Sequence, residues 1–366
     1  MTPVDPPHIH PTWHLLETWH SDDCVRAISA ETGTAEGPAK SIHLGFPDQR
    51  QNHGISTDSI FLIASPTKPF VATAIMMLVQ QGHLHLSDRV SRYLPRFDVS
   101  GKRNIRLIHL LTHTSGLPDM LPNNLELRKD HAPLSEYMEN VYDVDLLFKP
   151  GYRVHYQSMG ILTLATILES ITDESLPAFL DRTVFTPLKM HQTTLGIRVK
   201  SGAADPMQHQ VHVQVDDQEG ATDWGWNSLY WRKLGAPWGG LLSTAGDLGK
   251  FYRHLLQISS GSPGILHPLT LQAMIRNQLT TMPHISPEVA RSTPWGLGWQ
   301  LNWPNHPRGF GSILPPSAFG HWGATGTLGW IDPQRGVYGI VLTSSPIQLE
   351  NRPHIAFANL CRTAWN

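Results

Sequence analysis

A serine and a lysine three positions apart offer a nucleophile and an acceptor for its proton, in the Ser-Pro-Thr-Lys stretch at residues 65–68. If a helix begins at Ser65, its first turn places the amine of Lys68 on the same face as the hydroxyl. Serine is a good N-cap residue, and the proline that follows suits the first helical position. The spacing therefore predicts a helix that begins at Ser65, continues along the apolar run 71–81 and ends at Gly82.

The same residues also have a plain structural reading, in which Ser65 only caps a buried helix and Lys68 is solvated. Ser-x-x-Lys is common by chance and requires context before it indicates catalysis. A lysine in a first turn opposes the helix dipole, so a cation at Lys68 needs a reason. The apolar run 59–64 predicts a strand that leads directly to the serine, a strand-to-helix junction.

Composition excludes several classes of function. The chain has 366 residues, enough for one large or two ordinary domains, and a formal net charge of -2, which gives no basic surface for nucleic acid. Cys24 and Cys361 cannot form a disulfide framework, and no Cys-x-x-Cys pair is present for zinc or redox chemistry. The N-terminus lacks a secretory signal pattern, and no apolar run approaches a membrane span. We expect a cytoplasmic monomer or small homo-oligomer that binds neither membrane nor nucleic acid.

Periodicity predicts an α/β domain assembled from both ends of the chain, residues 12–81 and 239–366, and a mainly helical domain inserted between them, residues 82–238. The expected strands cover 24–30, 39–46, 59–64, 295–301, 318–323, 328–333 and 336–344, with a turn-rich stretch at 31–37. The expected helices cover 11–20, 104–112, 159–171 and 354–363, and a further helix begins at Ser243 or Thr244.

A tryptophan-rich loop at residues 204–238 is the longest irregular stretch. Trp224, Trp226, Trp231 and Trp238 lie in it, and long irregular segments often carry binding function. We interpret it as an excursion on the substrate side. The alternative is a solvated loop whose tryptophans cover the core.

Histidines at positions 109 and 113 raise the question of a metal site. They are four residues apart on one predicted helix face, but the glutamate of His-Glu-x-x-His is missing and no third ligand is evident. We expect no metal, and expect His113 to be a buried hydrogen-bonding residue in the Thr-His-Thr-Ser-Gly turn.

Further motifs give Ser65 and Lys68 their context. In chain order they are Leu110-Leu111-Thr112-His113-Thr114-Ser115-Gly116-Leu117, Tyr156-Gln157-Ser158, Gly239-Gly240-Leu241-x-Ser243-Thr244-Ala245-x-Asp247-Leu248, Trp295-Gly296-Leu297-Gly298-Trp299 and His321-Trp322-Gly323-Ala324. In order and spacing, from about residue 20 to 365, the chain resembles the serine β-lactamase and penicillin-binding-protein superfamily, in its class C β-lactamase-like branch. The resemblance implies a β-lactamase/transpeptidase-like fold, with a central antiparallel sheet flanked by the terminal helices.

The resemblance also implies roles for individual residues. Ser65 would be acylated, Lys68 would assist its deprotonation, and Tyr156 would share proton transfer to the leaving group. A lysine serves as a base only if burial or a nearby cation keeps it partly neutral. Whether Lys68 or Tyr156 is the base stays open at this point. Tyr156 also has a structural reading, as a core tyrosine at the entrance of the following helix.

Two departures from the family pattern concern the substrate. Ser158 replaces an asparagine that normally helps to hold the acyl side chain, and Trp322 replaces a threonine whose hydroxyl binds a substrate carboxylate. We expect Ser158, His321, Trp322 and Gly323 to form the substrate-binding surface, although His321 also has a reading as an ordinary strand histidine. By analogy, the backbone amides of Ser65 and Ala324 form the oxyanion hole.

The sequence thus predicts a cofactor-free serine hydrolase acting on small esters or amides, with a carboxylesterase favoured. A D-amino-acid peptidase or amidase, a β-lactamase and an acyltransferase are the enzymatic alternatives. The alternative of another class is a binding or scaffold protein that keeps the fold without the chemistry.

Overall fold

A computed structural model of the chain describes residues 10–22, 24–48, 54–99, 101–197, 209–215, 223–303, 306–346 and 353–365. Its main feature is a six-stranded antiparallel sheet with the strand order β2-β1-β9-β8-β7-β6. The strands are β1 (Ala27–Thr34), β2 (Pro38–Gly45), β6 (Gln300–Leu301), β7 (Phe319–Gly323), β8 (Thr327–Asp332) and β9 (Val337–Thr343).

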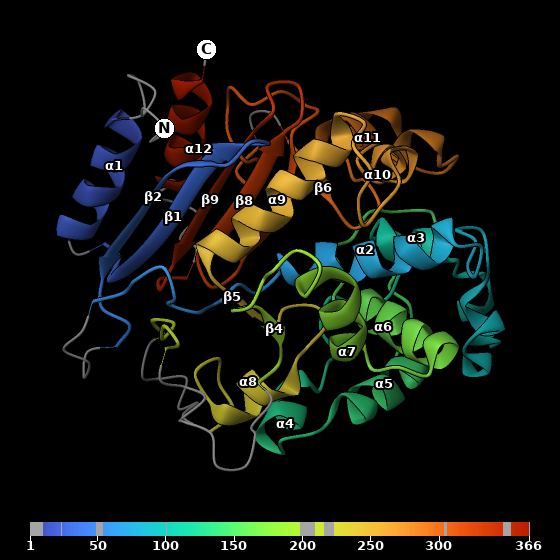
Figure 1. Cartoon of the computed structure of the whole chain (residues 1–366). Coiled ribbons are helices and arrows are strands. Elements are labelled where there is room, and N and C mark those ends of the chain that lie inside the picture. Colours follow the sequence, from blue (N-terminus) through green and yellow to red (C-terminus); the bar gives the residue numbers. More distant parts are fainter. Residues whose placement is uncertain are drawn as a thin grey trace.

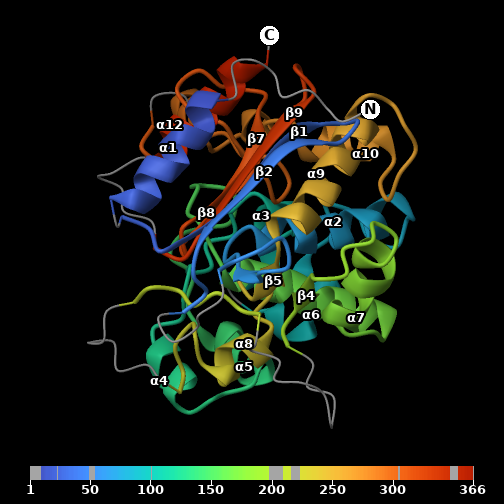
Figure 2. The ribbon, with the colours of Figure 1, turned by 60° about the vertical axis from the view of Figure 1, so that its left-hand side comes forward.

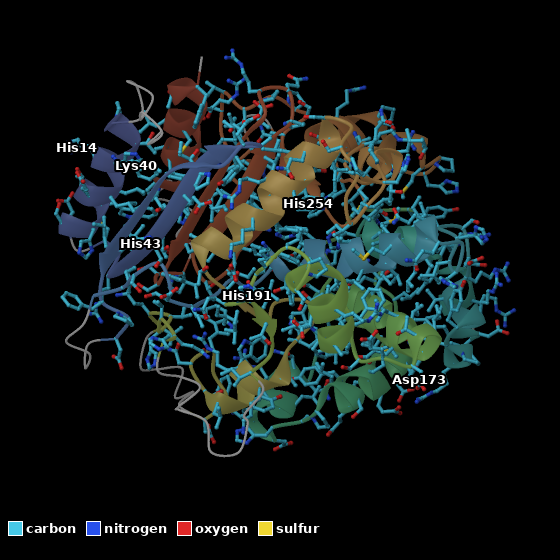
Figure 3. The ribbon with its side chains drawn as sticks, viewed as in Figure 1. His14, Lys40, His43, Asp173, His191 and His254 are labelled. Atoms are coloured by element: carbon cyan, nitrogen blue, oxygen red, sulfur yellow. The ribbon has the colours of Figure 1, made fainter. Side chains whose placement is uncertain are left out.

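The sheet joins the two ends of the chain, because β1 pairs along its length with β9, with Ile28 opposite Thr343. The terminal helices α1 (His10–Ser21) and α12 (Pro353–Ala364) pack together on one face, while α9 (Ala245–Ser259) crosses β1 and β9 on the other (Figure 1). On the α1 side, Lys40 extends from β2, and its ammonium lies 5.7 Å from the ring centroid of Trp13, whereas His43 contacts the Ser29 hydroxyl of β1 at 3.0 Å (Figure 3). The predicted fold class is confirmed.

Below the sheet lies a mainly helical region, in which the helix α6 (Met159–Thr172) is buried on most of its length (Figure 2). The apolar side chains of this region share one continuous core with α2 (Thr67–Gln80), with α9 and with one face of the sheet. The remaining helices are α3 (Leu107–Leu111), α4 (Asn124–Lys129), α5 (Leu134–Asp143), α7 (Leu176–Leu180), α8 (Leu229–Leu234), α10 (Pro268–Met274) and α11 (Pro287–Ser292). The division into two domains stays a prediction.

A small second sheet delivers the chain to the predicted site. Its strands are β3 (Phe61–Leu62), β4 (Thr194–Leu195) and β5 (Leu241–Ser243), in the order β3-β5-β4. Strand β3 leads into α2, so the strand-to-helix junction expected at Ser65 is present. Among the described residues, no helix is long and apolar enough to span a membrane.

Several predicted boundaries were wrong. The first strand continues to Thr34, through most of the stretch predicted as a turn, because residues 28–34 pair with β9. The strand predicted over 295–301 is limited to Gln300–Leu301, since the chain reverses within it and Gly298 adopts a positive φ of 74°. The irregular segment 204–238 contains a short helix, α8, although its residues 204–208 and 216–222 lie outside the described residues.

Candidate active site

The junction between β3 and α2 exposes the Ser65 side chain instead of using it as a cap. Ala64 adopts a left-handed conformation, with φ 55°, and the Thr67 hydroxyl and amide both donate to its carbonyl, at 2.6 and 2.9 Å. The helix therefore begins at Thr67 with Pro66 as its N-cap, so the predicted start at Ser65 was wrong. Because Ser65 does not cap the helix, its hydroxyl is available to other partners.

The far end of α2 stops where the sequence predicted. Gly82, at φ 81°, donates to the Val79 carbonyl, and His83 donates to the Leu78 carbonyl. These two bonds form a Schellman motif, which requires a residue such as glycine in the left-handed region. The helix that carries Lys68 is thus fixed at both ends.

Lys68 is buried beneath Ser65, with only 1% of its surface exposed. Its Nζ donates to Ser65 Oγ at 3.0 Å and to the backbone carbonyl of Trp238 at 2.7 Å. Burial lowers the pKa of Lys68 to about 7, and the nearby Asp119 carboxylate opposes that shift. At neutral pH a substantial share of the lysine is uncharged and able to accept a proton.

Tyr156 stands on the other side of the lysine, in the segment just before α6. The Lys68 ammonium lies 4.6 Å from the centroid of its ring. The Tyr156 hydroxyl is buried and has no hydrogen-bond partner at ordinary distance among the described residues, although Ser65 is close enough to lower its pKa. Burial outweighs that effect and raises the pKa of Tyr156 well above its usual range. The hydroxyl is therefore protonated at neutral pH, and it is free to donate.

His113 supports Tyr156 from behind. It is fully buried in a left-handed turn with φ 58°, its Nδ1 accepts from the Gln157 amide at 3.2 Å, and its ring lies 4.7 Å from that of Tyr156. Burial holds the pKa of His113 well below its ordinary value, which keeps the ring neutral. The predicted buried hydrogen-bonding role is confirmed. No group of three or more metal-ligating side chains occurs in the part of the chain that the structure describes.

The end of β7 is attached directly to the residues before Ser65. The hydroxyls of Thr325 and Thr327 donate to the carbonyls of Leu62 and Ile63, at 2.7 and 2.6 Å. A Cβ on Gly323 would lie 2.3 Å from the Ile63 carbonyl oxygen, so only glycine permits this approach. The attachment brings Ala324 next to Ser65 in one cavity wall. Neither backbone amide donates to an acceptor among the described residues.

His321 and Trp322 point to opposite faces of β7, as neighbours on a strand must. His321 is buried, its Nδ1 contacts the Trp322 carbonyl at 2.7 Å, and burial together with the nearby Lys68 lowers its pKa to about 3. Its Nε2 has no partner among the described residues. Trp322 packs against His354 of α12, with the ring centroids 5.2 Å apart.

These residues surround a cavity of about 360 Å³. Its wall is largely aromatic and contains one carboxylate and one guanidinium, from Asp119 and Arg308. Of the eight predicted site residues, the structure places six in this wall, and the other two, Lys68 and Ser158, are buried behind it. The lining residues are Ser65, Asp119, Tyr156, Trp295, Gln300, Trp303, Pro307, Arg308, His321, Trp322, Gly323, Ala324, His354 and Ile355.

Asp119 is one of the cavity residues that the sequence analysis missed. Ser158, which was predicted to contact substrate, is 3% exposed and donates its hydroxyl to Asp119 Oδ1 at 2.6 Å. The Ser158 amide also donates to the Asp119 carbonyl at 3.2 Å. The side chain that faces the cavity here is thus Asp119. Its position three residues after Gly116 carried no catalytic signal of its own.

Comparison with known proteins places this geometry in context. A Salmonella typhimurium protein whose assignment as a D-alanyl-D-alanine carboxypeptidase is provisional is 27% identical over 329 residues, which cover 83% of this chain and 72% of that protein. EstCE1, described as a hydrolase with promiscuous acyltransferase activity, superposes with a TM-score of 0.78 at 18% identity, over 97% of this chain and 98% of its own. A penicillin-binding protein homologue from Caulobacter crescentus also gives 0.78 at 18% identity, over 99% and 98% of the two chains.

The two structural likenesses, at such low identity, bear on the fold alone. The family assignment rests on the sequence, because the model of the Beta-lactamase family matches residues 26–360, nearly the whole chain. The chain belongs to the Beta-lactamase family, whose members are serine hydrolases related to the penicillin-binding proteins.

Proposed function

We propose that the protein hydrolyses small esters or amides through an acyl-enzyme at Ser65, with carboxylic esters as its preferred substrates. The observation that carries the proposal is the contact between Ser65 Oγ and Lys68 Nζ, 3.0 Å apart, where the pKa of the lysine is lowered to about 7. A serine hydroxyl is a weak nucleophile and needs an adjacent base. A buried lysine that is partly uncharged at neutral pH meets that need.

The acylation step follows from this geometry. The Ser65 proton passes to Lys68 while Oγ forms a bond to the substrate carbonyl carbon, and the negative charge on the carbonyl oxygen is held by the amides of Ser65 and Ala324. The bond to the leaving oxygen or nitrogen then breaks. We assign Tyr156 as the donor of the proton that this group takes, and Lys68 as the group that restores the tyrosine proton.

Deacylation reverses the proton path. A water molecule passes a proton to Tyr156 while Tyr156 passes its own proton to Lys68, the water oxygen bonds to the acyl carbon, and the bond to Ser65 Oγ breaks as Lys68 returns a proton to the serine. The products are a carboxylic acid and the free enzyme. An alcohol in place of water would give acyl transfer, an activity that the description of EstCE1 mentions for that protein.

The cavity supports esters over β-lactams as substrates. Its wall is mainly aromatic, and at the position following His321 it presents a tryptophan packed on His354 instead of a hydroxyl for a carboxylate. A cavity of about 360 Å³ suits a small acyl group with its leaving group.

The test uses 4-nitrophenyl acetate and butyrate, with nitrocefin and a D-alanyl-D-alanine peptide as competing substrate classes. We expect ester turnover that Ser65→Ala lowers by several orders of magnitude, as loss of a nucleophile does. Intact mass spectrometry should show a fluorophosphonate adduct on the wild type and none on Ser65→Ala. Turnover that survives Ser65→Ala contradicts the mechanism, and an unlabelled, inactive wild type supports the scaffold alternative.

A further inference from the structure

The cavity holds a carboxylate that the acylation chemistry does not use. Asp119 is partly buried in the wall, and only its Oδ1 is occupied, by the Ser158 hydroxyl at 2.6 Å. Within the described residues, no lysine, arginine or histidine forms an ion pair with Asp119. Lys68 interacts with it only at longer range. A carboxylate in a cavity wall without an ion-pair partner can form a charge-assisted hydrogen bond with a ligand that carries a positive charge.

The aromatic residues of the same cavity favour the same kind of ligand. Tyr156, Trp295, Trp303 and Trp322 form its wall, and aromatic faces attract an organic cation, most strongly when water is excluded. A cavity wall that combines a carboxylate with tryptophan and tyrosine rings is suited to an ammonium group. The one cationic side chain of the wall, Arg308, is exposed, and it is not among the ion-pair partners of Asp119 within the described residues.

The rigidity of Asp119 adds to the argument. Its backbone carbonyl and its carboxylate are both bound by Ser158, which stands at the N-cap of the buried helix α6. The carboxylate is therefore fixed before substrate binds, and the remaining oxygen, Oδ2, has no hydrogen-bond donor among the described residues. Pre-organised acceptors lose little on binding a cation.

From this we infer that the preferred substrates are small esters or amides that carry a protonated amine, bound at Asp119. The inference rests on the proposed hydrolase function, since it names the substrate class of that same site. Ser158 is then the residue that orients Asp119, which accounts for a serine at the position where the family pattern has an asparagine.

The test compares charged substrates with neutral ones of the same shape. Alanine ethyl ester, as both enantiomers, is paired with ethyl isobutyrate, and 2-(dimethylamino)ethyl butyrate is paired with 3-methylbutyl butyrate, so the protonated amine is placed in the acyl part or in the alcohol part. The readout is the ratio of kcat/KM between the charged and the neutral member. Both members of a pair need the same base, so a change in the pKa of Lys68 alters both values of kcat/KM equally and leaves their ratio unchanged.

In Asp119→Asn, which keeps an oxygen for Ser158, we expect the ratio to fall about tenfold or more for at least one pair, because a charged hydrogen bond is lost. Arg308→Gln should raise the ratio. Asp143→Asn is the matched control: it removes a negative charge from a side chain that is 82% exposed and is not part of the cavity wall, and should leave the ratio unchanged. Circular dichroism checks that each variant is folded.

The outcomes separate the inference from the function it rests on. If the wild type hydrolyses the neutral esters through Ser65 and neither ratio responds to Asp119→Asn, the amine site is refuted while the hydrolase stands. If no ester or amide is turned over and Ser65 is not labelled by a fluorophosphonate, the hydrolase itself is refuted.

Discussion

The pH dependence of turnover tests Lys68 as the proton acceptor most directly. The lysine must be uncharged to take the Ser65 proton, and its pKa in the folded protein is about 7. We therefore expect kcat/KM for an uncharged ester to rise with pH as Lys68 loses its proton, and to level off above the pKa. For one ionisation at about pH 7, the uncharged fraction grows from ~0.1 at pH 6 to ~0.9 at pH 8, roughly a tenfold gain.

The cause of the shift supplies a second test of the same prediction. Burial lowers the pKa of Lys68, and Asp119 raises it. Asp119→Asn should therefore move the midpoint of the profile to lower pH, because the charged amine loses a favourable neighbour. Lys68→Arg should abolish turnover, since a guanidinium stays protonated.

The assay measures initial rates of ethyl butyrate hydrolysis in a pH-stat between about pH 5 and pH 9, so that the substrate carries no titrating group. The stability of each variant is checked across the same range. A profile that is flat, or one centred near the ordinary lysine pKa of about 10.4, would refute the assignment of Lys68 as the base. A midpoint that moves upward in Asp119→Asn would refute the electrostatic account of its pKa.

Three further predictions concern single residues. Tyr156→Phe should lower kcat by about 10²–10⁴ with a small change in KM, because it removes the donor to the leaving group, and steady-state kinetics on 4-nitrophenyl butyrate measures this. Gly323→Ala should lower kcat by about 10²–10³, because the new Cβ would displace the Ala324 amide from the oxyanion hole, whereas Gly37→Ala, where a Cβ meets nothing within 4 Å, should leave kcat unchanged. Lys68→Met should raise the free energy of unfolding at pH 7 by about 1–3 kcal/mol, as measured by urea denaturation. Burying the lysine costs the folded protein on the order of 4 kcal/mol at that pH, and its hydrogen bonds recover only part of this cost. Between pH 7 and 10.5 the unfolded chain binds more protons at Lys68 than the folded one, so wild-type stability should rise through this window and the advantage of the variant should shrink. A variant that is no more stable than the wild type would contradict that burial cost.

The sequence predicted those parts of the site that depend on local spacing. Ser65 and Lys68 are joined by one helical turn, so their contact followed from the chain alone. The N-terminal hairpin, the C-terminal strands and α6 were likewise predicted to within a few residues, because their apolar periodicity is strong. The helix start was misjudged because Ala64 takes a left-handed conformation, which no propensity assigns to alanine.

The rest of the site depends on contacts that leave no local signal. Asp119 and Ser158 are 39 residues apart, and neither is unusual in its own segment. Lys68 and the Trp238 carbonyl are 170 residues apart, and a backbone acceptor is the same for every residue type. Partners of this kind become visible only when the fold brings them together.

The hydrogen bond from Lys68 to the Trp238 carbonyl constrains the length of the chain around residue 238. Because Lys68 is held by the carbonyl of residue 238 and not by its indole, this hydrogen bond depends on the path of the chain and not on the identity of the side chain. Substitutions in the tryptophan-rich segment can therefore reshape what surrounds the lysine without disconnecting it. A deletion that shifts residues 236–240 by one position would instead remove the carbonyl and leave a buried ammonium with one partner fewer. A substitution of the buried Trp238 should lower stability through lost packing but keep the pKa of Lys68, whereas a single-residue deletion should change both, which urea denaturation and the pH profile of turnover would reveal.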